Sequence, residues 1–77
     1  MSEPVRLDLQ GLKCPLPVLR VRKAMRRLGV GAEIVAVCTD PLSVIDIPHW
    51  AAQDGHALLE TSRDGETYAF RIRKGTA

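Results

Sequence analysis

A cysteine followed by two closely spaced prolines is the part of this sequence best suited to chemistry. Residues 11–17 read Gly-Leu-Lys-Cys-Pro-Leu-Pro, with the thiol at Cys14 and the prolines at Pro15 and Pro17. A thiolate is a nucleophile and a redox-active group, and its reactivity depends on its exposure and its pKa. The function of the chain therefore depends on how the backbone presents this thiol.

Two prolines in one turn indicate the start of a helix. The first N–H groups of a helix have no partner within it, so a proline there removes no hydrogen bond. We expect Pro15 and Pro17 to stiffen the approach and to place Cys14 at or just before the positive end of the helix. The backbone N–H groups of Leu16 and Val18 would then stabilise a thiolate and lower the pKa of Cys14.

The two cysteines favour different interpretations. Cys14 lies outside any apolar pattern, and the nearby positive charges of Lys13, Arg20 and Arg22 favour its thiolate. A packing role, which is the usual one for a free cysteine, is the less favoured alternative for Cys14. Cys38 ends an apolar segment, so burial in the core is its expected role.

The helix that follows Cys14 is predicted to be amphipathic and to end near Gly29. Its apolar arc comprises Val18, Val21, Ala24, Met25 and Leu28. Its opposite arc is basic and comprises Arg20, Lys23, Arg26 and Arg27, with Leu19 among them. A solvated surface is the usual role of such a basic arc, but we favour a docking surface for acidic protein partners, with Leu16 and Leu19 as apolar contacts.

Four strands and a second helix complete the predicted elements. The strands are expected at residues 5–9, 33–38, 56–61 and 66–73, where patterns of apolar residues alternate or run continuously. The second helix is expected at 42–53, with Asp40 as N-cap, Pro41 as first helical residue and a bend at Pro48. Residues 62–65 are the hairpin turn, and 74–77 are expected to be a frayed tail.

The order β-α-β-α-β-β predicts an α/β (α+β) two-layer sandwich. The first two strands are parallel with a right-handed crossover, the last two are antiparallel, and both helices lie on one face of a mixed sheet. We expect a single domain over residues 1–77, because a chain of this length holds one modest core and no deep pocket.

Composition narrows the function classes further. The chain is 45% hydrophobic and 26% charged with a net charge of +2, too little to indicate nucleic-acid binding. It has no apolar run of membrane-spanning length and no signal-peptide pattern at its start, so we expect a cytoplasmic protein without membrane attachment. In the cytoplasm its two cysteines are expected as reduced thiols.

At this point the sequence resembles a known family. The segments LDLQGLKCPLPVLRVRKAMRRL, VCTDPLSVIDIP and RIRKG are similar to those of the TusA/SirA family of small sulfur carriers, over about Val5 to Gly75. The Cys-Pro-x-Pro element between a strand and a helix carries the resemblance. Matching positions are Asp8, Gly11, Leu12, Cys14, Pro15, Pro17, Val18, Asp40 and Pro41.

The resemblance implies a function and a fold. Cys14 would carry sulfane sulfur as a persulfide, with Gly11, Lys13, Pro15 and Pro17 as the surrounding motif. The donor would be a cysteine desulfurase or a rhodanese-like protein, and the acceptor a DsrE-like or TusD-like protein. The pathway would be tRNA thiolation, sulfur oxidation or cofactor metabolism, and the family's sheet order is 1-2-4-3. No cofactor is implied.

Three other interpretations remain. Cys38 would lie toward the same sheet edge as Cys14, so a disulfide-based redox sensor is an alternative. RNA binding is another, but the sequence supplies no exposed aromatic stacking pair, and we do not expect direct nucleic-acid binding. The spacing of His49 and His56 with the cysteines matches no zinc pattern, so we expect no metal.

Overall fold

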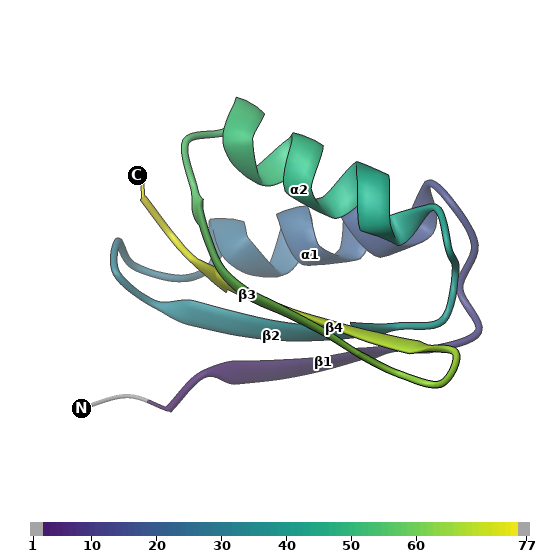
Figure 1. Cartoon of the computed structure of the whole chain (residues 1–77). Coiled ribbons are helices and arrows are strands. Elements are labelled where there is room, and N and C mark those ends of the chain that lie inside the picture. The colour runs from purple at the N-terminus through teal and green to yellow at the C-terminus, as the bar shows by residue number, and fades with distance from the viewer. Residues whose placement is uncertain (1–2, 76–77) are drawn as a thin grey trace.

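The computed structural model describes residues 3–75, in which two helices cover one face of a four-stranded sheet (Figure 1). The strands are β1 (Val5–Leu9), β2 (Glu33–Cys38), β3 (Ala57–Asp64) and β4 (Thr67–Arg73), and the helices are α1 (Leu16–Arg26) and α2 (Ser43–Gln53). The predicted element order and the α+β class are confirmed.

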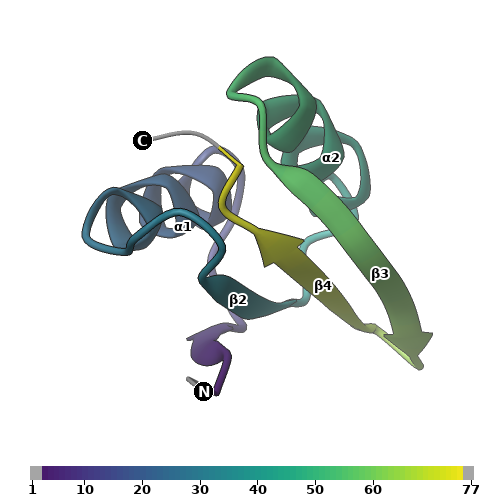
Figure 2. The ribbon, with the colours of Figure 1, turned by 90° about the vertical axis from the view of Figure 1, so that its left-hand side faces the viewer.

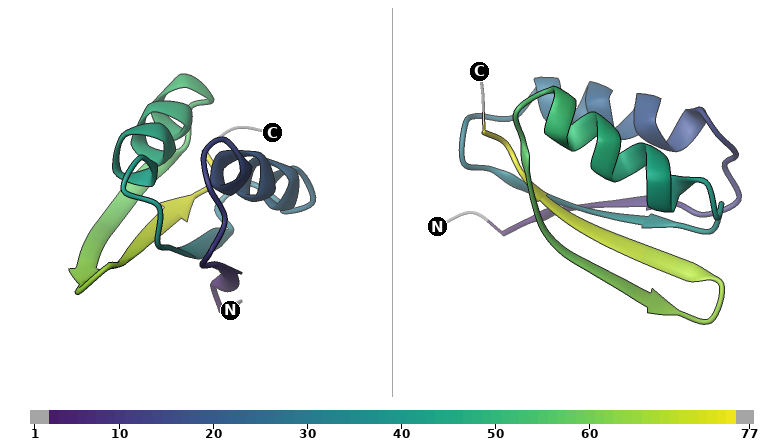
Figure 3. Two further views of the ribbon diagram at one scale, coloured as in Figure 1. Left: turned by 90° about the vertical axis from the view of Figure 1, so that its right-hand side faces the viewer. Right: turned by 45° about the horizontal axis from the view of Figure 1, so that its top comes forward.

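The sheet order is β1-β2-β4-β3, with β1 parallel to β2 and β4 antiparallel to both of its neighbours. The register of the parallel pair places Leu9 opposite Cys38, so the two strands end at the same level. The loops that follow β1 and β2 consequently lie side by side at one end of the sheet (Figures 1 and 3). This end carries the amino ends of both helices.

The core lies between the sheet and the helices (Figure 2). Strand residues alternate between the two faces of a sheet. The side chains buried from the sheet include Leu9, Ile34, Ala36, Cys38, Phe70 and Ile72, and those from the helices include Val21, Met25, Ile47, Trp50 and Ala51. Both helices therefore pack against the sheet through the apolar face of each helix.

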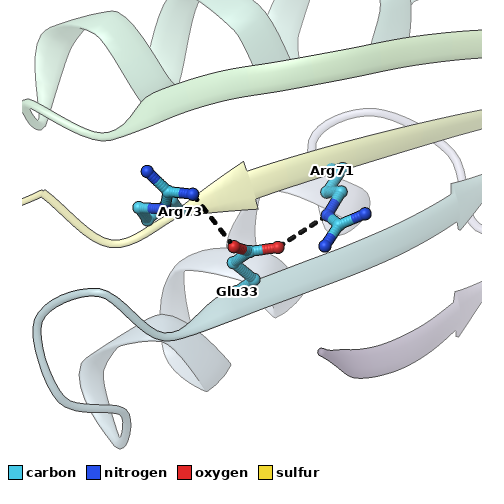
Figure 4. A network of polar contacts seen from close by, with 3 residues as sticks. All are labelled: Glu33, Arg71 and Arg73. Atoms are coloured by element: carbon cyan, nitrogen blue, oxygen red, sulfur yellow. Dashed lines mark hydrogen bonds and ion pairs between the residues drawn. The ribbon is translucent and has the colours of Figure 1, made fainter. Parts of the chain in front are cut away.

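The opposite face of β2 and β4 carries an ion-pair network (Figure 4). Glu33 accepts a hydrogen bond from Arg71 at 2.6 Å and one from Arg73 at 3.3 Å. The hydrogen bond from Arg71, more than the one from Arg73, holds the pKa of Glu33 below its usual value. These pairs link neighbouring strands on the face that the helices leave open.

The amphipathic character predicted for α1 is confirmed. Val21 and Met25 are buried, and the basic arc of Arg20, Lys23, Arg26 and Arg27 is exposed together with Leu19. The helix ends at Arg26, before the expected stop at Gly29, and the N–H of Arg27 bonds to the carbonyl of Ala24.

The start of α2 and the hairpin differ from the prediction. The helix begins at Ser43 because Asp40 forms a turn before it. The side chain of Asp40 accepts a hydrogen bond from the N–H of Leu42, and the backbone carbonyl of Asp40 accepts one from the N–H of Ser43. Asp40 thus closes the turn before the helix instead of capping the helix itself. Strand β3 continues to Asp64, beyond the expected end at residue 61, because Gly65 with φ of +61° allows a tighter turn.

The frayed tail predicted from residue 74 is wrong for its described part. Lys74 is 7% exposed, and its Nζ donates to the carbonyl of Leu28 at 2.6 Å. Its backbone also pairs with Gly31 and Ala32. Residues 76–77 of the predicted tail, and residues 1–2 of the chain start, lie outside the described residues. Among residues 3–75, no helix is long and apolar enough to cross a membrane.

Candidate functional site

Cys14 lies exposed in the loop between β1 and α1, two residues before the helix begins. Two hydrogen bonds fasten this loop to the loop after β2. The N–H of Gly11 donates to Oγ1 of Thr39 at 2.8 Å, and the N–H of Cys14 donates to Oδ2 of Asp40 at 2.6 Å. The parallel pairing of β1 and β2 brings these loops together and so determines where the thiol is held.

The motif residues around Cys14 form a tight turn into the helix. Gly11 has a φ of +82°, a conformation that favours glycine, and the peptide bond between Cys14 and Pro15 is cis. Pro15 is the N-cap residue, and Pro17 is buried in the first turn of α1. The N–H of Leu16 donates to the carbonyl of Lys13 at 2.8 Å, so it is not the donor to the sulfur that the sequence suggested.

Asp46, which the sequence analysis did not select, contacts the thiol directly. The Sγ of Cys14 donates a hydrogen bond to Oδ2 of Asp46 at 2.8 Å, across 32 positions of sequence. This bond raises the pKa of Cys14, with smaller contributions from burial and from the negative charges of Asp46 and Asp40. The expectation of a lowered pKa is therefore wrong, because the thiol donates to one carboxylate and the negative charges of two carboxylates disfavour the thiolate.

Asp40 is the second carboxylate of the site. It accepts hydrogen bonds from the N–H groups of Cys14 and Leu42. These bonds, and then the positive charge of Lys13, hold the pKa of Asp40 below its usual value. Asp40 therefore stays ionised, and its carboxylate holds both the thiol-bearing loop and the turn before α2.

Cys38 has the core position that its sequence predicts. It is fully buried, and burial raises the pKa of its thiol while a hydrogen bond with Ser43 opposes that rise. Both cysteines are free thiols in the structure. The exposed thiol and the buried one thus differ sharply in their access to another molecule.

Exposed apolar side chains occur where both helices begin. Leu16 and Leu19 on α1 are 42% and 49% exposed. Leu42, Val44 and Ile45, where α2 begins, are also exposed and were missed as candidates. A signal for them exists in the sequence, since a second helix with apolar residues at consecutive positions cannot bury all of them.

A shallow hollow of about 450 Å³ opens beside the thiol, and its walls are residues 11–14 and 39–42. Within residues 3–75, no group of three or more His, Cys, Asp or Glu side chains is arranged to hold a metal ion. His49 is exposed, and Nδ1 of His56 accepts the N–H of Gly75. The arrangement at Cys14 is suited to reaction of its sulfur with a partner that approaches from outside.

Known proteins share this sequence and this fold. The family model described as sulfurtransferase TusA matches residues 5–74. The sulfur carrier protein TusA of Allochromatium vinosum is 40% identical over 68 residues, which cover 88% of this chain and 90% of that protein. YrkI of Bacillus subtilis is 39% identical over 69 residues, covering 90% of this chain and 92% of that protein.

A solved structure agrees with these matches. The crystal structure of a SirA-like protein from Desulfitobacterium hafniense has a TM-score of 0.82 and 26% sequence identity, covering 94% of this chain and 99% of that one. The family model spans nearly the whole described structure, and these two relatives match along most of their length. The chain belongs to the sulfurtransferase TusA family.

Proposed function

We propose that this chain is a sulfur carrier that accepts sulfane sulfur as a persulfide on Cys14 and passes it to a partner protein. The observation that carries the proposal is the exposed Sγ of Cys14, on a loop whose backbone is fastened to Asp40. A carrier needs one accessible sulfur in a defined position, and this small domain supplies it without a deep pocket. Membership of the TusA family supports the same function.

The chemistry balances without an external oxidant. The Cys14 sulfur, as the thiolate, attacks the outer sulfur of the donor's persulfide, and the bond between the two donor sulfurs breaks. The donor leaves as a thiol that takes up the proton Cys14 has lost, so the donor is reduced and Cys14 is oxidised. In discharge, the acceptor's thiolate attacks the outer sulfur on Cys14, and Cys14 returns to the thiol.

The exposed side chains suggest how partners approach. The basic side chains of Arg20, Lys23, Arg26 and Arg27 would attract acidic surfaces, and Leu16 and Leu19 would supply apolar contact near the thiol. Donors of the proposed relay are a cysteine desulfurase or a rhodanese-like protein, and the acceptor is a DsrE-like or TusD-like protein. Leu42 extends this docking surface to the other wall of the hollow beside Cys14.

The proposal also covers the domain, the cellular compartment, the residues that position the thiol and the pathway that is supplied. Residues 1–77 act as one domain, and the relay operates in the cytoplasm. Gly11, Lys13, Pro15 and Pro17 position the thiol. The sulfur supplied would serve tRNA thiolation, sulfur oxidation or cofactor synthesis. A thiol-based redox regulator or an RNA-binding domain is the alternative.

Loading and discharge test the proposal directly. Incubation with a cysteine desulfurase and cysteine should add the mass of one sulfur atom to the intact chain. Addition of a DsrE-like acceptor with its cysteine reduced should remove that mass and transfer it to the acceptor. If neither a desulfurase nor a rhodanese loads the protein with sulfur, the proposed function is wrong.

A further inference from the structure

The contact between Cys14 and Asp46 joins two elements that are far apart in the chain. Asp46 lies in the first turn of α2 and is half-buried, so its carboxylate is held in place by the helix. The Sγ of Cys14 donates a hydrogen bond to this carboxylate at 2.8 Å. In the empty carrier, which holds no transferred sulfur, Cys14 is therefore a hydrogen-bonded thiol. Sulfur transfer by itself does not require such a contact.

The charges facing the thiol come from three segments. Asp46 is on α2, Asp40 is on the loop after β2, and Lys13 is on the same loop as Cys14. Both carboxylates act to raise the pKa of Cys14, whereas Lys13 acts on Asp40. The empty site is thus built to keep its proton, against the usual preference for a depressed pKa at a reactive cysteine.

We propose that Asp46 is a positioning residue that distinguishes the empty carrier from the loaded one. It holds the empty Cys14 sulfur as a thiol directed at α2, and it releases that sulfur once a second sulfur is attached. The loaded half of this inference rests on the proposed persulfide function; the half concerning the empty thiol rests on the contact alone.

The change on loading follows from the valence of sulfur. In a persulfide the Sγ of Cys14 is bonded to the outer sulfur, about 2.05 Å away, and has no proton to donate. The hydrogen bond to Asp46 is therefore lost. The outer sulfur becomes the ionising group, and when it is an anion the carboxylate repels it. The outer sulfur turns from α2 toward the open side of the loop, where an acceptor approaches.

Holding the thiol in this way protects the empty carrier. Alkylating agents and oxidants react with the thiolate, so a thiol that keeps its proton reacts slowly. The loaded carrier has no such restraint on its outer sulfur. Asp46 thereby slows the side reactions of the empty thiol, while loading proceeds through the small fraction of thiolate that attacks the donor's persulfide.

The test measures the rate of alkylation of empty Cys14 by iodoacetamide as a function of pH, in a Cys38→Ser background. Asp46→Asn keeps the shape and removes the charge, Asp46→Glu restores a carboxylate, and Asp64→Asn is a control on the exposed end of β3. Circular dichroism and thermal melting verify that each variant is folded. The pH profile responds to the ionisation of the thiol, which a purely structural role of Asp46 would not change.

We expect Asp46→Asn to move the profile to lower pH. Each unit by which the pKa of Cys14 falls gives about ten times more thiolate at neutral pH, and the weaker nucleophile reduces the gain to about threefold. The variant should therefore react faster at pH 7, by about threefold for each unit by which the pKa falls, and the difference should vanish or reverse at high pH, where both thiols are ionised. Asp46→Glu should restore slow reaction, and Asp64→Asn should match the parent.

Two results would overturn the inference. One is an unchanged profile in folded Asp46→Asn, or an equal shift in Asp64→Asn. The other concerns the desulfurase-loaded protein: if Asp46→Asn accelerates alkylation of the persulfide as much as that of the empty thiol, Asp46 does not distinguish the two states. A chain that never loads but shows the shifted profile would refute the proposed function and leave the contact's effect on the thiol standing.

Discussion

The backbone N–H of Cys14 donates to the carboxylate of Asp40 at 2.6 Å, which fastens the thiol-bearing loop to the loop that follows the neighbouring strand. The same carboxylate accepts the N–H of Leu42 just before α2. One side chain therefore sets the position of Cys14 relative to both helices. The site depends on this junction as much as on the cysteine.

Replacing Asp40 by Ala should loosen the junction. The amide protons of Cys14 and Leu42 lose their acceptor, so hydrogen exchange at these two positions should become faster, by tenfold or more if local opening costs about 1.4 kcal/mol less. Sulfur loading should slow because the thiol is no longer held in one position. Hydrogen exchange measured by NMR checks this, with Asp64→Ala as the control.

The pH dependence of stability gives Asp40 a second signature. The pKa of Asp40 in the folded protein lies below the usual 3.8. The stability that its ionised carboxylate contributes is therefore complete above that value and is lost as the pH falls through the folded pKa. The difference in melting temperature between the parent and Asp40→Ala should therefore shrink on acidification to about pH 3. A constant difference over that range would contradict the role of the carboxylate.

Charge reversal on α1 tests the docking surface. Arg26→Glu with Arg27→Glu should slow sulfur transfer from an acidic partner by about tenfold at low salt, because steering of the encounter is electrostatic. Both residues are exposed, so the fold should be retained. The transfer rate is measured by quenching the reaction at intervals and determining the intact mass of the carrier. Raising the salt concentration should reduce the difference in rate between parent and variant.

The same double variant separates protein docking from RNA binding. Of the three aromatic side chains, Trp50 and Phe70 are buried and Tyr68 is partly buried against the core, which leaves no pair of exposed rings on which bases could stack. We therefore expect no tight tRNA complex in either protein. A salt-sensitive, micromolar complex with tRNA that the double variant loses would favour the RNA-binding alternative.

Lys74 should matter for stability in spite of its place near the chain end. Lys74→Met keeps the aliphatic stem but leaves the carbonyl of Leu28 without its donor, which should cost about 1–3 kcal/mol of unfolding free energy. Denaturant titration measures the loss, and Lys23→Met, whose side chain is exposed on α1, is the matched control. Equal stability of Lys74→Met and the parent would mean that the buried ammonium contributes nothing.

Local pattern was sufficient to predict most of the fold. Alternation in residues 5–9 and the prolines at the start of α1 are short-range signals, and the structure has both elements where these signals lie. The errors occur where long-range contacts act. Lys74 is ordered by the carbonyl of Leu28, which is 46 positions away, and no local pattern encodes that contact. The extension of β3 to Asp64 is an exception, because it depends on the local turn at Gly65.

The candidate site shows the same division. The exposure of Cys14 follows from its prolines and from its place in a loop, so the sequence was enough to select it. Asp46 was missed, since its contact with Cys14 depends on how α2 is set over the end of the sheet. A usable signal did exist, because parallel neighbours place the loops after residues 9 and 38 together and Asp46 follows the second loop by one turn.

The central claim is that Cys14, and not Cys38, holds the transferable sulfur. Intact-mass measurement after incubation with a cysteine desulfurase and cysteine tests it in two folded variants. Cys14→Ser should gain no sulfur, whereas Cys38→Ser should still gain one sulfur atom and lose only about 1 kcal/mol of stability through altered packing. Loading that survives Cys14→Ser and disappears in Cys38→Ser would contradict the account, and loading that needs both thiols would replace the single-cysteine carrier with a disulfide relay.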